Sequence, residues 1–245
     1  MVIQHNIAAN NAYRNLSSNS ANGQKNLEKL SSGFRINRSA DDAAGLAISE
    51  QMRSKINGLD QATANANDAI GLIQTAEGAL TETHSMLQRM VTLATQSANG
   101  TYNTTARSAI SAEVAALKSE LDRIASTTDY NGVKPLAASS AIQVQVGPTS
   151  GETLDIAAAK MDVRSLSIKD IKVSTVSTAN SAITKINAAI DKVSSHRANL
   201  GASQNRLDHT INNLKTTSEN MNAAESRIRD TDMAKEIAAF TKNNI

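Results

Sequence analysis

The sequence predicts a mainly α-helical fold: an elongated antiparallel bundle of long, coiled-coil-like helices with a small β-hairpin insert. Apolar residues recur at alternating spacings of three and four over two stretches of more than forty residues. The only two prolines, Pro135 and Pro148, lie between these stretches, so neither helix is interrupted. Aromatic residues make up 2% of the chain, which favours thin helix-on-helix packing through Ala, Leu and Ile.

The first long helix is predicted around residues 52–94. Carboxylates at Asp41 and Asp42 suit its N-terminus because of the helix dipole. Asn99-Gly100 suits its end. Ten of the thirteen seam positions are apolar; the seam is Met52, Ile56, Leu59, Thr63, Ala66, Ile70, Ile73, Glu77, Leu80, His84, Leu87, Val91 and Ala94.

A shorter helix is predicted next, followed by a turn at residues 129–132. Asn103 and Thr104 can cap its start. Its seam keeps the same spacing and consists of Ile110, Val114, Leu117, Leu121 and Ile124. This helix should pack against the long ones.

The middle of the chain changes to the alternating pattern of a β-hairpin. Apolar Ile142, Val144 and Val146 alternate with glutamines. A turn-forming segment at residues 147–151 and a second short run at residues 154–156 complete the signal. Residues 168–177 alternate more weakly and could add extended chain.

The second long helix is predicted around residues 183–228. Ten of its fourteen seam positions are apolar; the seam is Ile183, Ile186, Ile190, Val193, Arg197, Leu200, Gln204, Leu207, Ile211, Leu214, Ser218, Met221, Glu225 and Ile228. Two such helices on either side of a short β insert favour an antiparallel pair.

The first forty residues carry only a weak seam. Tyr13, Leu16 and Leu27 keep the helical spacing, but Ser20 and Gly23 interrupt it. No obvious partner for this segment occurs within the chain. We therefore expect it to be mobile in a monomer and to become ordered on binding.

Charge and composition argue against several classes of function. The net charge of +2 is spread along the chain, whereas a nucleic-acid binder would show a concentrated basic face. No apolar run is long enough to span a membrane, and no cleavable secretory signal is evident at the start. Cysteine is absent, so disulfides and thiolate chemistry are excluded.

No constellation of residues suggests an enzyme, a metal site or a cofactor. The four histidines lack the i, i+4 pairing of a metal site. Glu77 and Glu82 could in principle act in acid–base catalysis, but no pocket signature accompanies them. We expect His84, which lies on the seam, to be a packed or partner-contacting residue. Gly71 and Gly78 are expected to allow close approach of helices.

Four motifs together resemble the bacterial flagellins. Residues 30–49 (LSSGFRINRSADDAAGLAIS) are similar to the N-terminal signature of that family, and residues 71–82 (GLIQTAEGALTE) to the stretch that follows. Residues 224–236 (AESRIRDTDMAKE) and 241–245 (TKNNI) are similar to its C-terminal region. The likeness covers essentially the whole chain.

The resemblance implies a filament subunit of the bacterial flagellum that supports swimming motility. Other copies of the subunit, the flagellar type III export machinery and an export chaperone would be its partners. It implies an inner assembly segment at residues 1–42 and a helical rod at residues 43–235, with the hairpin region at about 130–178. Residues 236–245 would begin a C-terminal assembly segment. The large outer domains of longer relatives are missing, and so is the helix that usually follows, so we expect a shortened chain.

The resemblance also implies a candidate partner-binding site at Gln88, Arg89, Leu93 and Glu113. Residues 88–96 (QRMVTLATQ) are similar to the flagellin segment read by the flagellin-sensing Toll-like receptor. Arg89 offers a forked donor and Leu93 an apolar anchor, a common hot-spot pairing. The alternative is that these residues serve packing between subunits.

Two other functions are also compatible with parts of the sequence. A non-polymerising coiled-coil adaptor would explain the seams but not the flagellin-like motifs. The hook–filament junction protein shares the terminal layout, although the match through residues 241–245 favours a flagellin.

Overall fold

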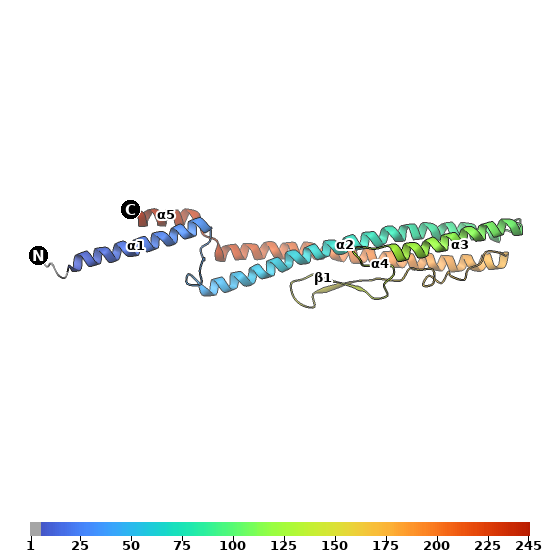
Figure 1. The fold of residues 1–245 in the computed structure, drawn as a ribbon, viewed down its shortest axis with the longest axis horizontal. Coiled ribbons are helices and arrows are strands. Elements are labelled where there is room, and N and C mark those ends of the chain that lie inside the picture. The colour runs from blue at the N-terminus through green and yellow to red at the C-terminus, as the bar shows by residue number, and fades with distance from the viewer. Residues whose placement is uncertain (1–5) are drawn as a thin grey trace. The chain divides into compact units, whose positions relative to one another are not determined.

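The computed structural model describes residues 6–245, so residues 1–5 of the expected terminal segment lie outside the described residues. The predicted fold class is confirmed: long helices dominate and one small hairpin interrupts them (Figure 1). In chain order the elements are α1 (Ile7–Ser32), α2 (Ala43–Ala98), α3 (Thr104–Thr127), β1 (Ile142–Gln145), β2 (Thr153–Ile156), α4 (Val176–Arg229) and α5 (Met233–Asn244).

The chain divides into two compact units. One comprises the described residues up to Asp60 together with Lys215–Ile245, and the other is Gln61–Leu214. The helices α2 and α4 each contribute to both units, so residues 43–60 and 215–235 group with the terminal helices rather than with the expected rod. We refer to the two as the terminal unit and the central unit.

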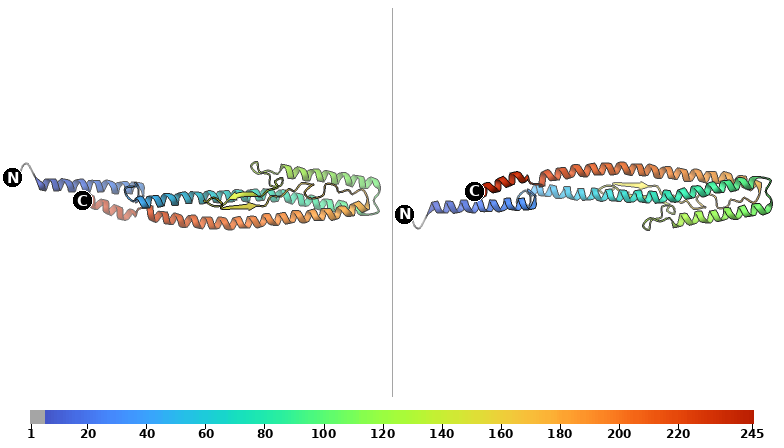
Figure 2. Two further views of the ribbon diagram at one scale, coloured as in Figure 1. Left: turned by 90° about the horizontal axis from the view of Figure 1, so that it is seen from below. Right: turned by 90° about the horizontal axis from the view of Figure 1, so that it is seen from above.

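The central unit is built around α2, which lies between α3 and α4 in both views of Figure 2. A helix with neighbours on two sides buries a wider stripe than a two-stranded seam does. The buried positions of α2 in this unit are Ala62, Ala66, Ala69, Leu72, Ile73, Ala76, Leu80, Thr83, Leu87, Met90, Leu93, Ala94 and Ser97.

The predicted seam of α2 is therefore only half right. Within the central unit, every second predicted position, such as Ile73, Leu80 and Leu87, is buried. The intervening predicted positions there, such as Ile70 and Glu77, are only half-buried. Their place is taken by the residues one step earlier, most of which are small: Ala62, Ala69, Ala76, Thr83 and Met90.

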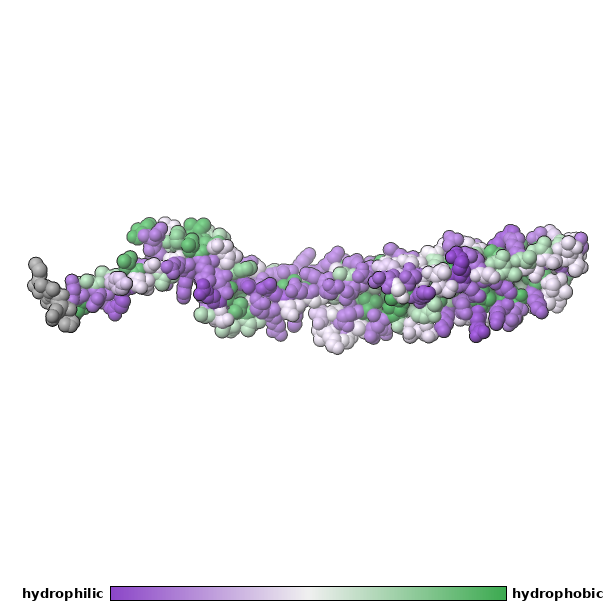
Figure 3. Space-filling view, in the orientation of Figure 1, coloured by the Kyte–Doolittle hydropathy of each residue, from purple (hydrophilic) through white to green (hydrophobic). Residues whose placement is uncertain are grey.

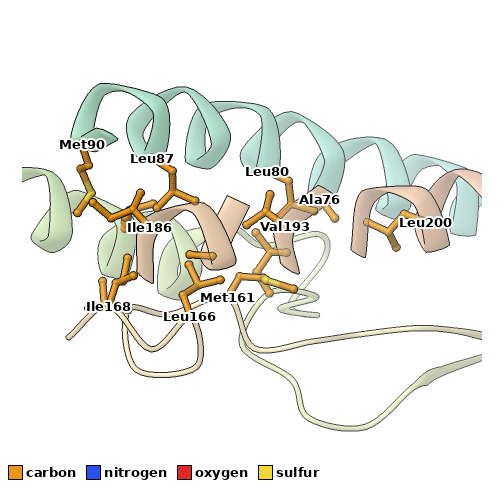
Figure 4. Close-up of a cluster of buried hydrophobic side chains, with 14 of the residues drawn as sticks. Ala76, Leu80, Leu87, Met90, Met161, Leu166, Ile168, Ile186, Val193 and Leu200 are labelled. Atoms are coloured by element: carbon orange, nitrogen blue, oxygen red, sulfur yellow. The ribbon is translucent and has the colours of Figure 1, made fainter. Parts of the chain in front are cut away.

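The helix α4 shows the same displacement within the central unit. Its buried stripe follows a regular 3-4 spacing through Ala179, Ala182, Ile186, Ala189, Val193, His196, Leu200, Ser203 and Leu207. Figure 4 shows Leu80 and Leu87 of α2 facing Ile186 and Val193 of α4. Because alanine occupies many of these positions, the backbones of the two helices can approach closely while the larger residues fill the remaining space.

The segment between α3 and α4 packs against the same core. The strands β1 and β2 pair antiparallel, with Ile142 opposite Ile156 and Val144 opposite Leu154, which confirms the predicted hairpin. Residues 168–177 contain no strand and add nothing to the sheet. Residues 168–175 run as a loop that buries Ile168 in the core, where Figure 4 shows it beside Leu166, and the last two residues begin α4.

Side-chain caps set the predicted helix boundaries in the central unit. The Asn103 side chain accepts a hydrogen bond from Ala106 N at 2.8 Å and starts α3. The predicted turn after α3 is also present, since Asp129 Oδ2 accepts from Gly132 N at 3.0 Å.

In the terminal unit, α1 packs against α5 (Figure 1). The expectation that the first forty residues have no partner within the chain is therefore wrong. The contact between α1 and α5 is polar as well as apolar. In the amide orientation that satisfies both of its neighbours on α5, Asn26 donates to Glu236 Oε1 (2.9 Å) and accepts from Asn243 Nδ2 (3.1 Å). No described residue of α1 is buried, however.

A compact junction ties the end of α1 to the end of α4. Arg35 N donates to Arg229 O, and Thr231 N donates to Gly33 O. The Arg229 guanidinium lies 4.7 Å from the centre of the Phe34 ring and donates to Glu50 at 2.7 Å. This hydrogen bond lowers the pKa of the Glu50 carboxyl below its ordinary value. Gly33, with φ of 75°, ends α1 in the left-handed conformation that glycine favours.

Candidate partner-binding surfaces

Two exposed surfaces could bind partners, and the first lies in the terminal unit. The exposed apolar residues of α1 and α5 there form what we call the terminal-helix surface: Ile7, Tyr13, Leu16, Leu27, Met233 and Ile237. Figure 3 shows apolar atoms gathered over α5. Tyr13 and Leu16 expose 75% and 67% of their area, which is far more than a solvated helix face requires.

A shallow groove of about 340 Å³ crosses the terminal-helix surface. Leu16, Leu27 and Phe240 supply its apolar lining, and asparagines from both helices rim it. An amphipathic helix with its apolar face left uncovered gains stability only when another surface covers that face. The geometry therefore suits another helix lying along α1 and α5.

The second surface lies in the central unit and contains the residues singled out in the sequence. Arg89 of α2 and Glu113 of α3 form an ion pair, with Arg89 Nη2 at 2.7 Å from Glu113 Oε1. Both side chains remain about half exposed, at 53% and 44%. Gln88 is exposed beside them and contacts His84 Nε2 at 3.0 Å. We call Gln88, Arg89 and Glu113 the Arg89 surface.

Leu93 does not belong to the Arg89 surface. It exposes 1% of its area and packs in the core of the central unit. The expectation that it offers an apolar anchor to a partner is inconsistent with this burial. Leu93 lies one helical turn after Arg89. Because α2 has neighbouring helices on two sides, the Leu93 side chain still points into the core.

The half-buried ionisable residues of the predicted α2 seam have partners within the central unit. Glu77 accepts from Arg197 of α4 at 3.4 Å, and His84 is bridged to Gln88. His196, on the buried stripe of α4, exposes 6% of its area, and burial lowers the pKa of its imidazole. Among residues 6–245, no group of three potential ligands could hold a metal ion.

None of the described helices is both long and apolar enough to cross a membrane. The helices are long, but charged and amide side chains recur along each of them.

Comparison with known proteins assigns both ends of the chain to one family. The profile of the bacterial flagellin N-terminal helical region matches residues 3–141, and that of the bacterial flagellin C-terminal helical region matches residues 183–245. Over its full length the chain is 52% identical to a flagellin of Halalkalibacterium halodurans and 46% identical to one of Bacillus subtilis. It covers 91% and 92% of these two proteins.

Solved structures agree with this assignment. The crystal structure of Bacillus cereus flagellin is 37% identical, with a TM-score of 0.56 over 66% of this chain and 94% of that one. A structure assigned to a flagellar hook-associated protein of Vibrio parahaemolyticus has a TM-score of 0.65 over 78% of this chain, but at 13% identity it shares only the fold.

Proposed function

The chain belongs to the bacterial flagellin family and is a structural subunit of the flagellar filament, and we propose that the terminal-helix surface is what drives its polymerisation. Filament assembly gives this family its role in motility and its extracellular location. The observation that supports this proposal is that α1, a 26-residue helix, buries none of its residues and leaves most of the Tyr13 and Leu16 side chains exposed.

Covering these side chains would supply much of the free energy of association. Burying a Leu or Ile side chain contributes roughly 1.5–3 kcal/mol relative to leaving it in water. Two or three such residues from each subunit offset part of the translational and rotational freedom lost on association, and a helix already formed in the monomer adds little ordering cost.

Seeded assembly followed by electron microscopy tests the proposal. Substituting both Leu16→Ser and Leu27→Ser should abolish or strongly slow filament growth, while the thermal unfolding of the central unit stays unchanged. Asn15→Ser, on the same exposed helix, is the matched control and should assemble normally. Filaments growing at the original rate from the double variant would refute the role of this surface.

We further propose that the Arg89 surface is recognised by the flagellin-sensing Toll-like receptor. It offers an exposed guanidinium–carboxylate pair from two helices, with an amide beside it. Because Arg89 and Glu113 are held by each other, a partner would meet an ordered, pre-arranged set of donors and acceptors. Leu93 would support this surface from beneath.

Receptor binding measured on two double variants distinguishes recognition of the Arg89 surface from a general effect of removing an ion pair. Arg89→Ala with Glu113→Ala should weaken binding, since it removes the ordered pair. The matched control is Arg123→Ala with Glu120→Ala, a similarly exposed pair on α3. Equal binding by both double variants would contradict the assignment. Leu93 is left intact, because its removal would disturb the core.

We also propose that the chain is exported through the flagellar type III channel with the aid of a chaperone. A chain without cysteine forms no cross-link that would obstruct passage of an unfolded polypeptide. Secretion that persists in cells lacking the flagellar export apparatus would argue against this route.

We also propose that the protein has no catalytic role. The two ionisable side chains of the predicted α2 seam, Glu77 and His84, contact Arg197 and Gln88 and do not line a pocket. Hydrolase activity in the purified protein that a Glu77→Gln or His84→Gln substitution abolished would overturn it.

A further inference from the structure

Four Asn-Gly pairs occur in the sequence, and each is a potential site of spontaneous covalent change. In such a pair the glycine nitrogen can attack the asparagine side-chain amide, because no side chain on the glycine hinders its approach. Whether it does so depends on the local backbone. The four pairs are Asn22-Gly23, Asn57-Gly58, Asn99-Gly100 and Asn131-Gly132.

Two of the pairs lie inside helices. Asn22-Gly23 is within α1 and Asn57-Gly58 within α2. In a helix the glycine N–H is engaged with the carbonyl four residues earlier, and ψ of the asparagine stays near −42°. Ring closure between the side chain and the next nitrogen then requires the helix to open locally, which slows the reaction.

The third pair lies in the turn after α3, where the attacking nitrogen is engaged. Gly132 N donates to Asp129 Oδ2 at 3.0 Å, and Asn131 has φ of 50°. The hydrogen bond directs the N–H toward the Asp129 carboxylate rather than toward the Asn131 side chain. This arrangement holds the reactants apart in the folded protein.

The fourth pair, in the turn between α2 and α3, is arranged differently. Asn99 Oδ1 accepts a hydrogen bond from Thr101 N at 3.2 Å, so the side chain folds over its own next peptide bond. This places the side-chain carbonyl carbon beside the Gly100 nitrogen and polarises the carbonyl group. Gly100 N donates no hydrogen bond to any residue between 6 and 245.

A cation also lies at this turn. Arg107 Nη2 donates to the main-chain oxygen of Asn99 at 3.0 Å, and its Nε donates to Ser97 O. This positive charge polarises the main-chain carbonyl of Asn99 and stabilises the negative charge that develops on its oxygen when water attacks the carbonyl carbon.

We propose that Asn99 is the principal deamidation site of the folded protein and that its main product is isoaspartate. The Gly100 nitrogen bonds to Cγ of Asn99, the Cγ–Nδ2 bond breaks, and the amide leaves as ammonia with the glycine N–H proton. The product is a five-membered succinimide. Water then opens the ring at one of its two carbonyl carbons.

Arg107 sets which carbonyl the water attacks. Attack at the main-chain carbonyl of Asn99, the one that receives the Arg107 hydrogen bond, breaks its bond to Gly100 N and leaves the chain running through Cγ as isoaspartate. Attack at Cγ would give ordinary aspartate. The modification adds one carbon to the backbone and one negative charge at the turn that joins α2 to α3.

Peptide mapping by mass spectrometry during incubation at mildly alkaline pH tests the proposal. In the folded protein, deamidation at Asn99 should exceed that at each of the other pairs by about tenfold, equivalent to a barrier difference of about 1.4 kcal/mol. In denaturant the four rates should converge. If one of the other pairs reacted at least as fast in the folded protein, or if the same preference persisted in denaturant, the proposal would fail.

Two variants separate the parts of the mechanism. Gly100→Ala should slow the reaction strongly without disturbing the fold, because nothing lies within 4 Å of the added Cβ and the residue has no positive φ. Arg107→Gln should lower the isoaspartate share of the product relative to aspartate. An unchanged product ratio would rule out the part assigned to Arg107, and an unchanged rate in Gly100→Ala would rule out attack by this nitrogen.

Discussion

Polar side chains sit at several buried positions of the central unit, and each has a different reason to be there. Ser97 donates to the Val173 carbonyl, which fastens the loop before α4 onto α2. Thr83 donates to the carbonyl of Ala79 within its own helix. His196 stands apart, since it is ionisable and exposes only 6% of its area. A buried imidazole is tolerated as the neutral form and resists protonation.

His196 should therefore make the central unit less stable in mild acid. Burial lowers its pKa below the ordinary 6.5 in the folded state. As the pH falls below 6.5, the unfolded chain binds a proton at this position that the folded chain does not, so the free energy of unfolding decreases. Denaturant unfolding at a series of pH values above the carboxylate range would show this slope. His196→Leu should flatten it, and parallel curves for the two proteins would exclude His196 as the source.

The burial of Leu93 leads to a second residue-level prediction. Leu93→Ala should lower the free energy of unfolding by roughly 2–5 kcal/mol, because it removes a fully buried side chain from a packed core. Gln88→Ala, five residues earlier on the same helix and exposed, should change it by no more than about 0.5 kcal/mol. Chemical denaturation of both variants measures the difference. Similar values for the two would mean that Leu93 is more accessible than its environment indicates.

At the scale of elements, the sequence predicted which segments form helices and strands better than it predicted the buried face of each helix. The 3-4 spacing of apolar residues is independent of what a helix packs against, so α2, α3 and α4 were foreseeable. The face was not, because the stripe is centred on small residues such as Ala69 and Ala76. Ala fits a buried or an exposed position, whereas Ile70 looked like a better seam residue and is only half-buried.

The glycines of α2 illustrate the same limit. Both Gly71 and Gly78 were expected to permit close approach of helices. A Cβ on Gly71 would instead lie 2.9 Å from the Tyr130 hydroxyl oxygen, in the turn after α3, and one on Gly78 would meet nothing within 4 Å. The difference arises from the contact of Gly71 with Tyr130, which is distant in the sequence, and no local sequence pattern predicts such a contact.

These two glycines give opposite predictions for alanine. Gly78→Ala should stabilise the central unit by roughly 0.5–1 kcal/mol, because alanine favours the helix and no neighbour is disturbed. Gly71→Ala gains the same helix preference but displaces the Tyr130 ring, and overpacking of this kind costs about 1–3 kcal/mol. Thermal unfolding of the two variants side by side would test this. Equal stabilisation by both would show that Tyr130 moves aside freely.

At the scale of the whole molecule, the composition is consistent with a subunit that is stable in one part and incomplete in another. The central unit holds a continuous apolar core drawn from α2, α3, α4 and the segment between α3 and α4. In the terminal unit, neither α1 nor α5 contains a buried residue. The weak seam of the first forty residues predicted this deficit, but the pairing of α1 with α5 depends on contacts over two hundred residues apart and was missed.

The contrast between the units predicts how hydrogen exchange will change on assembly. In the monomer, amides of α1 should exchange quickly, because its hydrogen bonds are solvent-exposed and little packing opposes local opening. Amides around Leu80 and Leu87 should already be protected by the central core. In filaments, protection should rise by orders of magnitude in α1 and α5 and change little in the interior of α2, since only the terminal helices acquire a covered apolar face. Mass-spectrometric exchange on matched monomer and filament samples measures both segments at once. Strong protection of α1 in the monomer would mean that its pairing with α5 suffices, and that polymerisation draws its free energy from another surface.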